Sequence, residues 1–199
     1  MSSAMKMAPR RMTVAEFLDW NSGDGTGALW QLHDGEPEMM APASDPRGSI
    51  QARLTQLPGV YLHARDGASR LVIAPGVIAP GVVPAHGSED NCLVPDIGVT
   101  CAPPTRERLM HQPLVLIEIP SPTNVSRTRA NVLAYRTIAS VAEIVVVHST
   151  AVGAEVSRRG AGGSWPRQPE MVDADGVLRL DSIGFAAPLR EAYRTGGLL

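Results

Sequence analysis

The chain has 199 residues, a formal net charge of −2, and 44% hydrophobic against 19% charged residues. This balance is typical of a single globular domain that can bury a core without disulfides or a structural metal. Because the chain is not a polycation, its charge argues against a strongly electrostatic, non-specific nucleic-acid binder, while leaving room for a local basic patch. The 19 glycines and 17 prolines argue against a helical bundle or coiled coil.

Hydropathy and the cysteines point to a cytoplasmic protein without a membrane span. No apolar run approaches the roughly 20 residues that a span requires, and the N-terminus lacks the apolar core of a secretory signal. Cys92 and Cys101 flank an expected strand, which would separate them by about 30 Å at ~3.3 Å per residue. A disulfide needs Cα atoms within about 7 Å, so we expect two free thiols.

The first predicted elements are a short helix and a β-hairpin. Thr13 and Glu16 have the spacing of a helix-capping box. Asp34-Gly35 separates two extended runs, 29–33 and 36–40, and Asp-Gly between such runs is a strong hairpin signal.

A longer helix is predicted next, because Ile50, Leu54, Leu57 and Tyr61 recur at three- and four-residue spacing. Pro58 removes one helical hydrogen bond and crowds the carbonyl four residues earlier. We therefore expect a kink at this position, or two shorter helices.

Strands dominate from residue 70 onward. The clearest are 93–100 and 114–119, followed later by a buried strand over 143–148. A strand also starts at 71–73, but two Pro-Gly pairs within 73–82 argue against a central strand there and indicate an edge or a loop excursion.

The remaining pattern predicts a helix over 124–138, capped by Thr123 or Ser121. Residues 152–183 predict short antiparallel strands, and 188–193 a short final helix.

This order of elements predicts a mixed α/β domain around one sheet. We expect the domain to cover residues 12–199, behind a disordered N-terminal arm of residues 1–11.

Asp96 and Glu118 are the strongest candidates for chemistry. Asp96 follows Pro95 in one predicted strand, and Glu118 ends the apolar run of the next. Two carboxylates on neighbouring strands can share a hard divalent cation, which prefers oxygen ligands. Such an ion would polarise a phosphodiester and lower the pKa of a bound water. The alternative is structural: Asp96 caps a turn and Glu118 pairs with an arginine.

Several short motifs, in order along nearly the whole chain, resemble the Uma-type family of restriction endonucleases, a bacterial branch of the PD-(D/E)XK nuclease superfamily. They lie at residues 13–18, 30–42, 94–99, 117–123 and 134–136.

The resemblance implies a restriction-endonuclease-like fold, a central mixed sheet flanked by helices, and DNA cleavage that depends on Mg²⁺ or Mn²⁺. It implies that Asp96 is the metal-binding aspartate of the Pro-Asp motif and that Glu118 is the second metal ligand. By analogy it also suggests a homodimer, since double-strand cleavage needs two active sites.

The sequence departs from this family at the lysine. The superfamily pattern places a lysine two residues after the glutamate, where this chain has Pro120. The Uma-type branch places it four residues before a tyrosine, and that position is Asn131, counted back from Tyr135. The only lysine of the chain is Lys6, in the predicted arm.

Two further positions of the family's site are changed. Arg127 stands where the family has an acidic residue, and Gln31 stands where it has a glutamate. Arg127 can steady phosphate charge but stays protonated, so it cannot act as a general base. Asn131 can hydrogen-bond a water but cannot take its proton. The pair that the resemblance implies as metal ligands is thus retained, while the residues around it are replaced.

Two functional hypotheses follow. The first is a divalent-metal-dependent DNA endonuclease, with activity reduced by the missing lysine. The second is a catalytically inactive module that keeps the nuclease fold for DNA binding or self-assembly.

Overall fold

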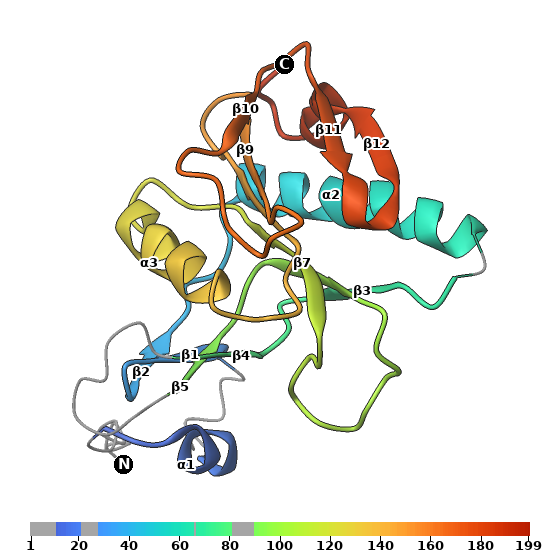
Figure 1. Cartoon of the computed structure of the whole chain (residues 1–199). Helices are drawn as coiled ribbons and strands as arrows, with labels where there is room; N and C mark the ends of the chain where they lie inside the picture. Colours follow the sequence, from blue (N-terminus) through green and yellow to red (C-terminus); the bar gives the residue numbers. More distant parts are fainter. Residues whose placement is uncertain (1–10, 21–27, 66, 81–89) are drawn as a thin grey trace.

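The protein is a mixed α/β domain built on a six-stranded sheet, with a four-stranded sheet and a two-stranded sheet beside it (Figure 1). This architecture confirms the fold class expected from the sequence, but the expectation of one sheet is wrong, because the strands in the described part of the chain divide among three sheets. The computed structural model describes residues 11–20, 28–65, 67–80 and 90–199. The predicted N-terminal arm, apart from Arg11, lies outside these residues.

The helices are α1 (Val14–Asp19), α2 (Asp45–Ala64) and α3 (Val125–Tyr135), with 3₁₀ turns η1 (Asp181–Ile183) and η2 (Leu189–Tyr193). The four-stranded sheet has the order β2-β1-β5-β4, from β1 (Trp30–His33), β2 (Glu36–Met39), β4 (Val77–Pro80) and β5 (Asp90–Leu93). The six-stranded sheet has the order β10-β9-β8-β7-β6-β3, from β3 (Arg70–Ile73), β6 (Ile97–Thr100), β7 (Pro113–Glu118), β8 (Glu143–Val147), β9 (Ala154–Arg158) and β10 (Glu170–Val172). The last sheet pairs β11 (Val177–Leu180) with β12 (Phe185–Pro188).

Alternating side chains of the six-stranded sheet build two separate cores. Ile117 of β7 and Val145 of β8 belong to one core, together with residues of α2, the β11–β12 hairpin and η2. Leu116 and Val146 belong to the other core, with residues of α3 and β4. Since residues two apart on a strand share a face, Glu118 lies on the α3 face with Leu116.

The predicted hairpin and short helix are both present. Asp34 and Gly35 have φ values of +49° and +76°, the left-handed pair that a two-residue hairpin turn demands and that glycine adopts without strain. Thr13 and Glu16 form the expected capping box.

Helix α2 runs through Pro58 as a single helix, so the alternative of two shorter helices is wrong. The helix continues because it is held by its buried face: Ile50, Leu54, Pro58 and Leu62 are all buried at helical spacing. Packing of this face outweighs one lost hydrogen bond, since most helix stability in proteins comes from tertiary contacts.

The predicted continuous strand 93–100 is also wrong. The chain leaves the four-stranded sheet after β5 and enters the six-stranded sheet at β6. Pro95 has no N–H to donate to a ladder and therefore favours an interruption here. The change of sheet places Asp96 at the junction, directly before β6. Cys92 and Cys101 are nevertheless free thiols, as expected.

Helix α3 begins later and ends earlier than predicted, with Asn124 as its N-cap residue. Neither predicted cap is used, because the hydroxyls of Ser121 and Thr123 hydrogen-bond each other, 3.1 Å apart. Near the C-terminus, the expected short strands are present, strand β12 was missed, and the final helix is the 3₁₀ turn η2.

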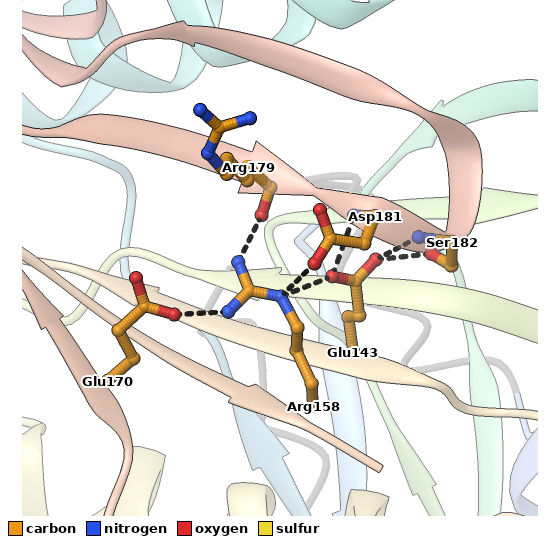
Figure 2. Close-up of polar contacts among 6 residues, drawn as sticks. All are labelled: Glu143, Arg158, Glu170, Arg179, Asp181 and Ser182. Carbon is orange, nitrogen blue, oxygen red and sulfur yellow. Dashed lines mark hydrogen bonds and ion pairs between the residues drawn. The ribbon is translucent and has the colours of Figure 1, made fainter. Parts of the chain in front are cut away.

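An ionic network around the buried Glu143 joins the β11–β12 hairpin to the central sheet (Figure 2). The carboxylate of Glu143 on β8, 3% exposed, accepts hydrogen bonds from the backbone N–H groups of Asp181 and Ser182, both at 2.9 Å, and from Arg158. Arg158 also pairs with Asp181 and Glu170. Glu143 thus anchors the start of η1 through its own charge.

We expect Glu143→Gln to lower the free energy of unfolding by roughly 3 kcal/mol, because hydrogen bonds to a buried charge are the strong ones. Glu170→Gln is the matched control. Its side chain is 54% exposed, so we expect a loss of about 1 kcal/mol or less from the same chemical change. Urea unfolding of both variants provides the measurement. Equal losses would contradict an anchoring role for Glu143.

Candidate functional site

Asp96 and Glu118 meet where β6 begins and β7 ends, at one end of two interior strands of the six-stranded sheet. In the antiparallel pair β6–β7, Ile97 lies opposite Ile117, so the next residues outward, Asp96 and Glu118, also face each other. Both are 5% exposed. The structure therefore places the two predicted site residues close together, near enough for the Asp96 charge to act on Glu118.

Each oxygen of the Asp96 carboxylate accepts one hydrogen bond. Its Oδ1 accepts a hydrogen bond from Arg47 Nη2 at 2.5 Å, and its Oδ2 accepts one from the Ile119 N–H at 2.6 Å. Burial raises the pKa of the Asp96 carboxyl, while the Arg47 charge and both hydrogen bonds act in the opposite direction. The structural alternative of a turn cap is wrong in detail, because the side chain pairs with Arg47 and accepts the N–H of Ile119, the residue directly after β7.

Arg47 was not predicted as a site residue. It lies in the first turn of α2, 9% exposed, on the same face as Ile50 and Leu54. Its Nε donates to the carbonyl oxygen of Ile119 at 2.6 Å while its Nη2 holds Asp96. The sequence signal was present: an arginine three residues before a buried isoleucine, at the spacing of the buried face.

Glu118 takes its hydrogen bonds from α3 rather than from an arginine. Its Oε1 accepts the Tyr135 hydroxyl at 2.7 Å and the Asn131 side-chain amide at 3.3 Å. Burial, and then the Asp96 charge, raise the pKa of Glu118 to about 8. The two carboxylates are therefore distinct: Asp96 is neutralised by a cation, and Glu118 favours its protonated form near neutral pH.

Asn131 is brought to the site as expected. It is 4% exposed, and its Oδ1 has no hydrogen-bond partner. An unpaired buried acceptor costs free energy. The oxygen is thus available to a water, a cation or a ligand donor. Tyr135, one helical turn away, completes the contact with Glu118.

Gln31 and Arg127 form a second cluster around Glu38, a residue not predicted for the site. Gln31 Nε2 donates to Glu38 Oε2 at 3.2 Å, and Arg127 pairs with Glu38 Oε1. Gln31 and Glu38 are opposite each other in the hairpin. Gln31 is 6% exposed, with its Oε1 unpartnered. Arg127 is thus paired on the groove wall and makes no hydrogen bond to Glu118.

These residues border a groove of about 820 Å³ between the hairpin and the start of α3. Its lining is mixed and includes Gln31, Glu38, Arg47, Ser121, Asn124 and Arg127. Asp96 and Glu118 are not among its lining residues, and Arg47 is the residue that both borders the groove and contacts Asp96.

A model of the Uma2 family, described as "Putative restriction endonuclease", matches residues 14–189. The chain belongs to the Uma2 family. This assignment confirms the resemblance found in the sequence. No curated protein matches this Uma2 chain.

A solved structure shares the fold. It is described as a putative nuclease belonging to DUF820 from Anabaena variabilis ATCC 29413, and it superposes with a TM-score of 0.72. The sequences are 17% identical, over 93% of this chain and 99% of that one. At this identity the likeness establishes the fold of the Uma2 chain.

Restriction-endonuclease-like families generally use divalent metal ions, and the donor set of the Uma2 chain fits such an ion. The described part of the chain has no group of three or more His, Cys, Asp or Glu side chains that could hold one. A cation would therefore combine the carboxylates of Asp96 and Glu118 with neutral oxygens, for which the Ile119 carbonyl and the unpaired Asn131 Oδ1 have suitable chemistry.

Proposed function

We propose that this Uma2 chain is a divalent-metal-dependent DNA endonuclease in which Asp96 and Glu118 hold a Mg²⁺ or Mn²⁺ ion. The observation that carries the proposal is the position of the two buried carboxylates, side by side at the ends of β6 and β7. Membership of a family of restriction endonucleases supports DNA as the substrate.

The ion, when bound, would polarise the phosphodiester and lower the pKa of a bound water. The residues of the chain itself orient the site. Tyr135 and Asn131 fix the Glu118 carboxylate through their hydrogen bonds. Asn131 Oδ1 can also accept a hydrogen bond from a water, but an amide cannot take its proton. With no lysine in this position, we expect a slow enzyme.

The test is cleavage of supercoiled plasmid DNA by the wild type with Mn²⁺ or Mg²⁺, compared with Asp96→Asn. We expect nicking that EDTA abolishes and that Asp96→Asn reduces to background, because the amide removes a charged metal ligand. Asp175→Asn, an exposed site in the β10–β11 turn, should keep wild-type activity. Undiminished cleavage by a folded Asp96→Asn variant would contradict the proposed site.

A second candidate is a catalytically inactive module that keeps the fold for DNA binding or self-association. The Arg47–Asp96 ion pair favours it, because one proposed metal ligand already has a cation in place. This candidate predicts DNA retardation on a gel without cleavage under any metal condition, and with equal affinity in Asp96→Asn.

We also propose that the chain forms a homodimer and is cytoplasmic. A homodimer would supply two sites for double-strand cleavage, and sedimentation of the purified chain tests it. Within the described residues, no helix is long and apolar enough to cross a membrane.

A further inference from the structure

The Arg47 guanidinium bridges two oxygens of the kind that a divalent cation binds. It contacts one carboxylate oxygen, Asp96 Oδ1 at 2.5 Å, and one carbonyl oxygen, that of Ile119 at 2.6 Å. Both are hard oxygen donors of the type that Mg²⁺ and Mn²⁺ prefer. One positive charge of the protein thus lies where the proposed ion would need its ligands.

We propose that Arg47 is a built-in competitor of the divalent ion: its guanidinium occupies the Asp96 and Ile119 oxygens, and an ion binds only when the arginine leaves them. This inference rests on the metal site of the proposed function. Two effects make the states exclusive. The same oxygens cannot serve both partners fully, and two cations at this separation repel each other in a buried site.

The groove beside Arg47 can accept its guanidinium once the side chain has left Asp96. The residue lies in the first turn of α2 and borders the large groove beside the site. Rotation of its long side chain would carry the guanidinium into the groove without movement of the helix. There it would meet solvent or the phosphate of a bound substrate, which a guanidinium recognises through two parallel hydrogen bonds.

This arrangement couples metal binding to the state of one side chain. In the free protein, the ion must displace a buried ion pair, and its apparent affinity falls by the cost of that displacement. The prediction depends on the charge of Arg47, since Gln51 and Ala74 are neutral and donate to the Asp96 backbone carbonyl instead of its carboxylate.

The test is a calorimetric titration of Mn²⁺, without DNA, into the wild type, Arg47→Gln and Arg47→Lys. We expect Arg47→Gln to bind Mn²⁺ at least about tenfold more tightly than the wild type, because the competing charge is gone. Arg47→Lys keeps the competing positive charge, so its affinity should stay within about threefold of the wild type. In the Arg47→Gln background, Asp96→Asn should abolish the gain.

Thermal unfolding gives a second readout, which applies even if the Arg47→Gln variant is poorly folded without metal. The Mn²⁺-induced rise in melting temperature should be larger for Arg47→Gln than for the wild type, because the ion then supplies the missing counter-charge. Equal or weaker Mn²⁺ binding by Arg47→Gln, with measurable binding by the wild type, overturns the competitor role and leaves the metal site standing. Absence of Mn²⁺ binding in all three proteins overturns the competitor role together with the proposed metal site.

Discussion

Replacing Asp96 with alanine is expected to lower the free energy of unfolding by about 3–5 kcal/mol, because the change leaves the buried Arg47 charge without its partner. The Ile119 N–H loses its acceptor in the same step. Urea denaturation measures the loss, as a lower midpoint with the same m-value as the wild type. Asp175→Ala, which truncates an exposed aspartate, should change stability by no more than about 0.5 kcal/mol.

A double-mutant cycle separates the ion pair from the loss of a side chain. In the Arg47→Met background, removal of the Asp96 carboxyl no longer strands a charge. The second change should therefore cost less than it does in the wild type, by about 1–3 kcal/mol. If the double variant loses the sum of the two single losses, Asp96 and Arg47 do not interact in solution, contrary to their 2.5 Å contact.

The pH dependence of stability should carry the signature of Glu118. Its pKa rises from 4.5 in the unfolded chain to about 8 in the folded protein. Between these values the folded state binds more protons than the unfolded state, so stability falls as pH rises, by up to about 1.4 kcal/mol per pH unit. This contribution is fully favourable below pH 4.5 and is lost by about pH 8.

Glu118→Gln isolates this effect. The amide keeps an acceptor for the Tyr135 hydroxyl but carries no titrating proton. We expect the variant to be more stable than the wild type at pH 8 in metal-free buffer and to show a flatter stability curve between pH 5 and 8. Glu36→Gln, at a side chain that is 63% exposed and pairs with an arginine, should run parallel to the wild type. Parallel curves for all three proteins would rule out a buried, proton-retaining Glu118.

The sequence predicted those parts of the fold that local chemistry decides. Asp34-Gly35 is typical of a two-residue hairpin turn, and the apolar run ending at Glu118 is typical of a buried strand. It failed where distant packing decides. Continuity of α2 through Pro58 depends on the core beneath it, and the break before Asp96 depends on two sheets that the local pattern does not distinguish.

The same division applies to the candidate site. The neighbouring carboxylates and the nearby Asn131 were predictable from motifs and their order. Arg47 and Glu38 were not, since each acts through a partner far away in the chain: Arg47 through Asp96, and Glu38 through Arg127. A buried arginine on an amphipathic face is the one local sign that an unseen anion lies opposite.

The segment between β5 and β6 connects two sheets and passes directly through the site. Leu93 belongs to the sheet that carries the hairpin wall of the groove, and Ile97 belongs to the sheet that carries Glu118. The short link between them contains Pro95, whose ring restricts rotation, and ends at Asp96. One short covalent segment therefore joins the sheet of the groove wall to the strand end at which Asp96 lies beside Glu118. The position of the Asp96 carboxylate is thus tied to both sheets.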